Sequence, residues 1–267
     1  MPEDRSSSPF RDLHRRAGAF IIPNPWDVGS AKILAAMGFQ ALATTSAGFA
    51  FSRGMKDGGV TIAEMLEHCV TIVAATPLPV SADLEKGFGD SPEDAAHTIR
   101  QAASTGLAGA SLEDFSGDPS RPIFDFGLAV ERIAAASEAA RGLGRDFVLT
   151  ARSENFLRGN PDLDDTIKRL QAFEAAGADV LYAPALRDLD QLRVVCAAVA
   201  KPVNVLVTAS FGLAELEAAG ATRLSIGSGL ARLAYGSLIQ AATEMRATES
   251  FTFLRNAGSF AEIEGNF

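Results

Sequence analysis

Short apolar runs and amphipathic stretches alternate along the chain in a regular rhythm. The apolar runs are as short and continuous as strands buried on both faces, and each precedes a segment with the 3.6-residue spacing of a helix. The predicted strands span residues 19–23, 41–45, 78–83, 109–113, 147–152, 180–183, 203–207 and 223–226. The predicted helices span residues 28–37, 61–75, 92–105, 128–143, 163–176, 189–200, 213–219 and 229–247, and residues 10–17 also have helical spacing.

Glycine follows several of these helices at the position where a helix end favours it, and the clearest sites are Gly38, Gly106, Gly177 and Gly220. Eight strand–helix units close more naturally into a (β/α)₈ barrel of the TIM type than they extend an open sheet. A doubly wound open sheet would need a Gly-x-Gly-x-x-Gly turn after its first strand, and residues 23–29 do not form one. We therefore expect one barrel domain over residues 1–267, with residues 1–9 flexible. The Phe-rich residues 248–267 should form a tail that packs on the barrel or on a neighbouring subunit.

Two acidic residues lie at the end of the third predicted strand. Alternation along a strand places residues i and i+2 on one face, so we expect Asp83 and Glu85 to point the same way. The fourth strand ends in Glu113, a third acid at the same edge. Buried carboxylates need a cation or hydrogen-bond donors, and oxygen ligands at the mouth of a cavity suit Mg²⁺. Two solvated acids at a strand end are the simpler alternative.

Two further strand ends carry groups suited to an anion. Thr45, Ser46 and Ala47 form a small-residue turn whose hydroxyl and N–H groups suit a carboxylate or an oxyanion. Arg152 ends the fifth strand, and a guanidinium facing inward there suits a bidentate grip on a carboxylate. An internal ion pair of Arg152 with Glu113 or Glu85 is the alternative. Together these residues fit a 2-oxo acid chelated to Mg²⁺, with the cation as Lewis acid for an enolate.

Composition limits the binding partners and the cellular compartment that we expect for the protein. The net charge is −9 over 267 residues without a basic run, which argues against nucleic acid and anionic membrane as partners. Cys69 and Cys196 lie far apart in predicted helices and indicate buried thiols of a reducing compartment. No apolar run reaches the roughly 18 residues of a membrane span, and residues 1–8 lack the apolar core of a signal peptide. We expect a cytoplasmic protein.

At these residues the sequence resembles the isocitrate lyase / phosphoenolpyruvate mutase superfamily, from about residue 20 to about residue 247. The motifs are Asp83-Leu-Glu85-Lys-Gly-Phe-Gly, Ser111-Leu-Glu113-Asp114 and Thr150-Ala-Arg152, together with the turn at residues 45–47 and the loop at residues 54–58. The resemblance implies a (β/α)₈ barrel, usually a tetramer whose last helix is exchanged between subunits. It also implies a small-molecule substrate.

The same resemblance implies a role for each matching residue. Asp83, Glu85 and Glu113 would hold Mg²⁺, largely through water, with Mn²⁺ as an alternative cation. Arg152 and the backbone around Thr45, Ser46 and Ala47 would bind a pyruvate-like unit, to which Asp83 would also be close. Asp57 matches an aspartate that closes over the site. On the seventh strand Asn204 and Thr208 could each reach the substrate, because the register is ambiguous by one residue.

The departures from the family pattern leave the reaction open. The lyases carry a Lys-Cys-Gly-His loop after the fourth strand, and the phosphonate-cleaving members carry a loop with Lys and Asn. Residues 115–125 match neither loop, so the general acid is unidentified. We expect a Mg²⁺-dependent lyase or decarboxylase acting on a small 2-oxo acid or related dicarboxylate through an enolate. The alternatives are C–P bond chemistry, as in phosphonopyruvate hydrolase or phosphoenolpyruvate mutase, and a 2-oxo acid binding protein whose catalytic loop has decayed.

Overall fold

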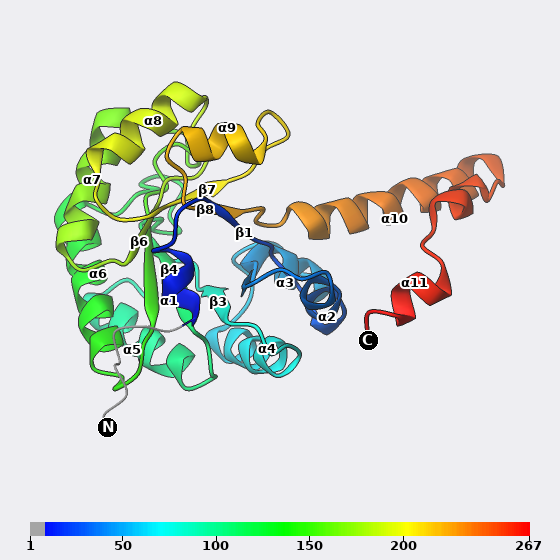
Figure 1. Ribbon diagram of the computed structural model, residues 1–267, viewed down its shortest axis with the longest axis horizontal. Coiled ribbons are helices and arrows are strands. Elements are labelled where there is room, and N and C mark those ends of the chain that lie inside the picture. The colour runs from blue at the N-terminus through cyan, green and yellow to red at the C-terminus, as the bar shows by residue number, and fades with distance from the viewer. Residues whose placement is uncertain (1–8) are drawn as a thin grey trace.

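Eight parallel strands form a nearly closed barrel in this computed structural model, which describes residues 9–267 (Figure 1). The strands pair in the order β1-β8-β7-β6-β5-β4-β3-β2. They are β1 (Phe20–Ile22), β2 (Leu42–Ala43), β3 (Val80–Asp83), β4 (Gly109–Glu113), β5 (Val148–Arg152), β6 (Val180–Tyr182), β7 (Val203–Leu206) and β8 (Arg223–Ser225). The predicted fold class is confirmed, and the strands are the predicted ones, several of them shorter by one to three residues.

Helices follow the strands and cover the outside of the barrel (Figure 1). They are α2 (Val28–Ala36), α3 (Ser46–Ser52), α4 (Ile62–Ala74), α5 (Pro92–Ala103), α6 (Phe126–Arg141), α7 (Leu163–Ala175), α8 (Leu189–Ala198), α9 (Leu213–Ala218) and α10 (Gly229–Thr248). The predicted turn after β2 is wrong in one respect, because residues 46–52 form the extra helix α3. Thr45 starts this helix, since its side-chain oxygen accepts a hydrogen bond from the N–H of Gly48.

Local sequence explains where the covering helices begin and end. Ser91 caps α5 with Pro92 at its first turn, and the side chain of Asp94 accepts a hydrogen bond from the N–H of Ser91. Gly177 and Gly220 have φ values of +103° and +101°, a left-handed conformation that glycine adopts without a steric cost. The helix boundaries predicted from these residues are accordingly confirmed to within a few positions.

The barrel has a seam between β1 and β2, which share no strand ladder. One backbone hydrogen bond crosses it, from the N–H of Ala43 to the carbonyl of Pro23. The buried side chain of Asn24 supplies further links. Its amide donates to the carbonyl of Thr44 at 3.2 Å, and its oxygen accepts from the N–H groups of Ile226 and Gly227. Asn24 therefore joins the chain after β1 to β2 and to the loop after β8.

The amino-terminal end of the barrel is closed by a short helix, α1 (Pro9–Leu13). Phe10 and Leu13 are buried against residues of β1, β5 and β6. The expectation of a flexible segment over residues 1–9 concerns mostly residues 1–8, which lie outside the described residues, whereas Pro9 already belongs to α1. Cys69 is a buried free thiol and Cys196 a half-buried one, in agreement with the absence of a predicted disulfide.

The carboxyl-terminal part leaves the barrel. Figure 1 shows α10 (orange) projecting outward, after which η1 (Thr252–Asn256) and α11 (Phe260–Glu264) turn back alongside it. Large apolar side chains of this arm are exposed, among them Leu233, Leu238, Ile239, Phe260 and Phe267. The tail therefore does not bury these side chains on its own barrel, and exchange of the last helix between subunits stays a prediction.

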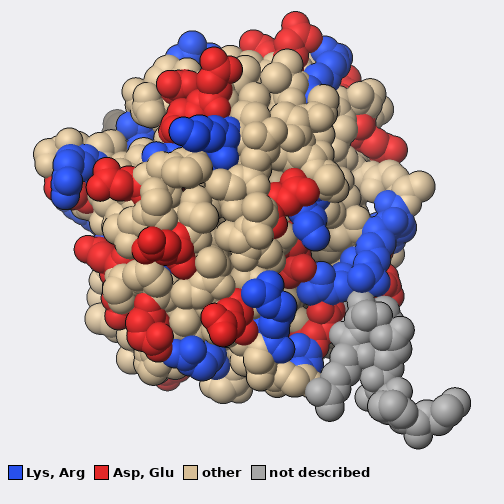
Figure 2. All heavy atoms as spheres, turned by 90° about the vertical axis from the view of Figure 1, so that its left-hand side faces the viewer, with Lys and Arg blue, Asp and Glu red and all other residues tan. Residues whose placement is uncertain are grey.

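The distribution of charged side chains on the surface agrees with the absence of a basic run in the sequence. Figure 2 shows one face of the molecule, on which acidic and basic side chains are interspersed without a broad basic surface. None of the helices formed by residues 9–267 is long and apolar enough to cross a membrane.

Candidate active site

A cavity of about 570 Å³ opens at the carboxyl-terminal ends of the strands, where barrels of this kind bind their ligands. Acidic, basic and apolar side chains from several strand ends and loops share its wall. Among the residues that line it are Thr45, Ser46, Ala47, Asp57, Asp83, Glu85, Glu113, Phe115, Arg152, Arg158, Tyr182, Thr208 and Arg232. Nine of the ten residues that the sequence indicated thus surround one cavity, and Asn204 is the exception.

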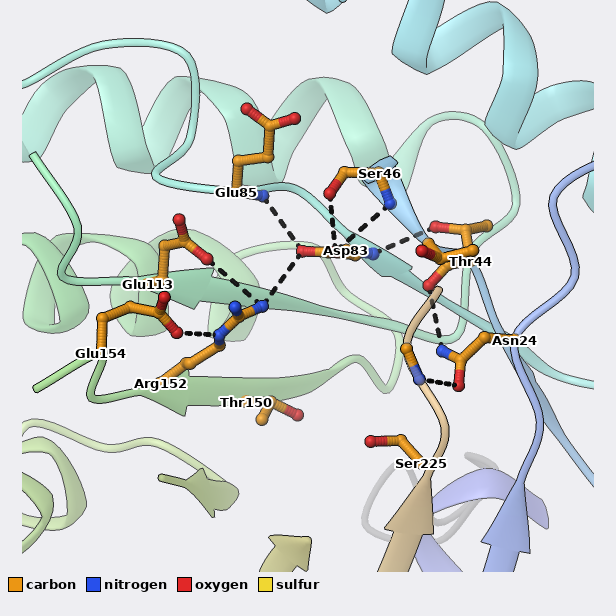
Figure 3. A network of polar contacts seen from close by, with 12 residues as sticks. Asn24, Thr44, Ser46, Asp83, Glu85, Glu113, Thr150, Arg152, Glu154 and Ser225 are labelled. Atoms are coloured by element: carbon orange, nitrogen blue, oxygen red, sulfur yellow. Dashed lines mark hydrogen bonds and ion pairs between the residues drawn. The ribbon is translucent and has the colours of Figure 1, made fainter. Parts of the chain in front are cut away.

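Asp83 ends β3 and is held by neighbouring hydrogen bonds (Figure 3). One carboxylate oxygen accepts from the hydroxyl of Ser46 at 2.9 Å and from its N–H at 3.3 Å, and the other accepts from the N–H of Glu85 at 3.3 Å. Thr44 fixes the strand end, because its hydroxyl accepts from the N–H of Asp83. Ser46, at the start of α3, therefore orients the carboxylate of Asp83 at the end of β3. This role of Ser46 does not depend on a bound ligand.

Glu85 does not continue the strand. β3 ends at Asp83, and Glu85 has a φ of +51°, so the alternation argument for a shared face does not apply to it. Glu85 nevertheless lines the same cavity, because the chain turns there. Its buried Oε1 atom has no hydrogen-bond partner among the described residues, and burial, with the charges of Asp83 and Asp57, raises its pKa to about 7. An unpaired buried carboxylate oxygen is costly and suits a cationic ligand.

Arg152 lies across from these acids at the end of β5 (Figure 3). Its guanidinium is 3.2 Å from Glu113 and 3.8 Å from Asp83, and it donates a short hydrogen bond to Glu154. Burial alone would lower the pKa of Arg152, but Glu113 and Glu154 hold it above its usual value. For the carboxyl group of Glu113, burial acts in the opposite direction and raises the pKa well above its usual range. The ion pair between Arg152 and Glu113, which the sequence left as an alternative, is therefore present. Arg152 still lines the cavity.

Arg158 is a second cation of this cluster that the sequence pattern did not reveal. It contacts Glu154 at 3.0 Å and Glu113 at 3.6 Å, and its guanidinium lies 3.6 Å from the ring of Phe115. The four-residue spacing from Glu154 to Arg158 is the one available sequence signal. Phe115 begins the loop after β4, which forms a short antiparallel bridge between Phe115 and Ile123. Arg158 thus packs this loop against the buried acids.

The acids fit a metal ion only if water completes its coordination. Among residues 9–267, no three His, Cys, Asp or Glu side chains converge closely enough to enclose a metal directly. Glu85 nevertheless lines the same cavity as Asp83 and Glu113, so the donor set of these three residues is all oxygen. Mg²⁺ keeps several waters and takes few carboxylates, so this donor set is compatible with it.

Asp57 reaches the cavity from the exposed loop between α3 and α4. Partial burial and the nearby charge of Asp83 raise its pKa, whereas Arg158 and Arg152 oppose that shift. The loop position is compatible with a residue that covers a bound ligand, as the family resemblance implied.

The structure places Asn204 away from the main cavity. Asn204 is buried within the barrel, where its oxygen accepts from Arg223 at 2.8 Å and its amide donates to Ser225 at 2.9 Å. Thr208, the alternative residue on this segment, lines the main cavity instead. The substrate contact assigned to Asn204 therefore has no support from the geometry of the main cavity.

Comparison with known proteins places the chain in a family. The family model for phosphoenolpyruvate phosphomutase matches residues 10–246. The chain belongs to the isocitrate lyase / phosphoenolpyruvate mutase superfamily. A crystal structure from Burkholderia cenocepacia J2315, whose assignment as a lyase/mutase is provisional, is 53% identical to this chain. It covers 96% of this chain and 93% of its own, with a TM-score of 0.93.

Two further members of the superfamily carry named activities. The 2-methylisocitrate lyase of Halalkalibacterium halodurans is 27% identical over 241 residues, which is 89% of this chain and 76% of that protein. The structure of an oxaloacetate acetylhydrolase in complex with its product oxalate is 25% identical. It covers 97% of this chain and 92% of its own, with a TM-score of 0.85. Both activities concern small carboxylic acids and belong to those proteins.

Proposed function

We propose that the protein is a Mg²⁺-dependent lyase that cleaves a C–C bond of a small 2-oxo acid or related dicarboxylate through an enolate. The proposal rests on the carboxylic acids Asp83, Glu85 and Glu113, which line one cavity. Membership of a superfamily of lyases and mutases, and the two relatives that act on 2-methylisocitrate and oxaloacetate, support the reaction type.

The side chains that line the cavity suggest a role for each residue in this reaction. Asp83, Glu85 and Glu113 would hold Mg²⁺, or Mn²⁺ in its place, largely through water. When bound, the cation supplies Lewis acidity for the negative charge that develops on the oxo group. Arg152 would face the substrate carboxylate, and the first N–H groups of α3, around Thr45, Ser46 and Ala47, would receive a carboxylate or oxo oxygen.

The decisive experiment measures turnover of a small panel of acids with and without Mg²⁺. We expect CO₂ or oxalate from oxaloacetate, or pyruvate from 2-methylisocitrate, and a loss of at least about 100-fold in kcat/KM for Asp83→Asn and Arg152→Lys. Asp90→Asn is the matched control, because Asp90 is an exposed acid of the same loop. Undiminished turnover in either of the two cavity variants would rule out this mechanism.

The same panel separates the alternative functions. Release of phosphate from phosphonopyruvate, without C–C cleavage of any other acid, would assign C–P chemistry, which the name of the matching family favours. The loop at residues 115–125 lacks Cys and His, which keeps a binding function as the third candidate. Thermal stabilisation by Mg²⁺ with oxalate, but no product from any acid, would identify a binding protein.

We also propose that the protein is a homo-oligomer, a tetramer or a dimer, assembled through α10. The exposed side chains of Leu233, Leu238 and Ile239 on this projecting helix support the proposal. Light scattering after gel filtration should give a mass above that of one chain. Ile239→Glu should shift the mass towards the monomer, whereas Ser237→Glu on the same helix should not. A monomeric wild-type protein would contradict the proposal.

A further inference from the structure

A second, smaller cavity lies inside the barrel, beneath the candidate active site. Its volume is about 50 Å³, and it is lined largely by polar side chains, which include Thr44, Ser81, Ser111, Asn204 and Ser225. Barrel interiors are usually filled by layers of bulky branched side chains, so small hydroxyl residues at these inward positions leave space. A water needs roughly 10–15 Å³ by this measure, so the cavity has room for a small ion with one or two waters.

Arg223 of β8 places a positive charge against this cavity. The side chain lines the cavity and is 5% exposed, and no Asp or Glu among residues 9–267 lies within ion-pair distance of it. Arg152 and Arg169, two other buried arginines, each contact carboxylates. A buried cation without a counter-charge costs free energy that hydrogen bonds to neutral groups recover only in part.

The partners of Arg223 are all neutral. It donates to the oxygen of Asn204 at 2.8 Å and to the hydroxyl of Thr150 at 2.9 Å, and it lies 3.3 Å from Nε2 of His14. Nδ1 of His14 lies 2.9 Å from the carbonyl of Phe10, so Nδ1 donates there and Nε2 accepts from Arg223. These contacts use three of the five guanidinium N–H groups.

Further donors face the same space. The hydroxyls of Ser81 and Ser111 line the cavity and make no side-chain hydrogen bond with any described residue. Figure 3 shows Thr150 and Ser225 below Arg152, on the side away from the acids of the main cavity. Asp83 borders the upper end of the small cavity, but its oxygens already accept from Ser46 and Glu85.

We propose that this inner cavity binds a small monovalent anion of the chloride class against Arg223. The anion supplies the counter-charge that the protein does not, and the serine and threonine hydroxyls complete its shell. Its place is the Arg223 end of the cavity, away from the carboxylate of Asp83. Asp83 and Arg152 line both cavities, but the anion would lie against Arg223, which lines only the inner one of the two.

The test compares thermal unfolding in sodium chloride with unfolding in sodium gluconate at equal ionic strength, because gluconate is too large for the cavity. A saturable rise in Tm of roughly 5–10 °C is expected at 100-fold excess of chloride over its Kd. Arg223→Gln and Ser111→Val should abolish or reduce the rise. Arg232→Gln, which changes an exposed cation of the main cavity, should leave it unchanged.

Bromide provides a direct readout on the wild-type protein, in case the Arg223 variant does not fold. Crystals soaked in sodium bromide should show an anomalous peak beside the Arg223 guanidinium. Identical Tm values in chloride and gluconate would overturn the proposal. So would an empty cavity in the bromide soak, or bromide bound only in the main cavity.

Discussion

Arg132 holds the loop that carries Glu85, and its removal should destabilise the protein severely. Arg132 belongs to α6, and its side chain is buried under the segment after β3. The guanidinium donates to the carbonyls of Gly89 at 2.9 Å and Ser91 at 3.1 Å, and it makes a short hydrogen bond to the carbonyl of Lys86. Arg132 thus donates to three carbonyl groups of the segment after β3, which does not belong to a strand.

The magnitude follows from these contacts. Hydrogen bonds from a charged donor contribute roughly 1.5–3 kcal/mol each, and desolvation of the guanidinium offsets part of that sum. The loop also carries backbone conformations that are uncommon for residues with a side chain, since Glu85 and Phe88 have φ values of +51° and +57°. For Arg132→Met we therefore expect a loss of about 3–5 kcal/mol in the free energy of unfolding.

Equilibrium unfolding in urea, followed by circular dichroism and by the fluorescence of Trp26, measures this loss. Trp26 is the single tryptophan of the chain, so one probe reports on the cavity end of the barrel. Glu131→Met is the matched control, because Glu131 is the exposed neighbour on the same helix, and it should change stability by less than about 0.5 kcal/mol. Hydrogen exchange at residues 85–90 should also accelerate in Arg132→Met. A loss below about 1 kcal/mol with unchanged exchange would refute the reasoning.

Two further predictions concern single positions. Gly220→Ala should destabilise the protein more than Gly38→Ala in thermal unfolding. Both glycines have positive φ, but a Cβ at Gly220 would lie 2.7 Å from the Cβ of Cys196, whereas a Cβ at Gly38 meets nothing within 4 Å; equal losses would contradict this account. Burial lowers the folded-state pKa of His14 to about 3 and of His68 to about 4. The unfolded chain therefore binds more protons below pH about 6.5, and stability should fall on acidification from there towards pH 4, by up to about 1.4 kcal/mol per pH unit for each histidine. His68→Leu should flatten that slope in urea titrations, and an unchanged slope would contradict the assignment.

The fold was predictable because its signals are local. Helix starts are visible in short polar stretches such as Ser91 to Asp94, and the strands are short runs rich in apolar residues. Eight of the nine helices from α2 to α10 were predicted over most of their length by such signals. The extra helix α3 was not, because its residues 46–52 are either small or aromatic, without a helical pattern, and follow β2 closely.

The candidate site was predictable only in part. The barrel geometry explains why Asp83, Glu113 and Arg152 meet, since parallel strands end at the same rim. The conformation of Glu85 could not be inferred, because strand alternation says nothing about a residue beyond the strand end. The burial of Asn204 depends on Arg223, nineteen residues away in sequence, and a one-residue register is not visible in the composition of β7.

The seam between β1 and β2 determines where the barrel can open. Every other pair of neighbouring strands is joined by a ladder, whereas this junction depends on one backbone hydrogen bond and on the amide of Asn24. We therefore expect thermal fluctuations to separate β1 from β2 before any other pair of neighbouring strands. Thr44 and Ser46, which orient Asp83, follow β2 directly. The weakest junction of the barrel thus adjoins the cavity at which we propose that a ligand binds. We therefore expect opening of the barrel wall at this junction to accompany entry and release of that ligand.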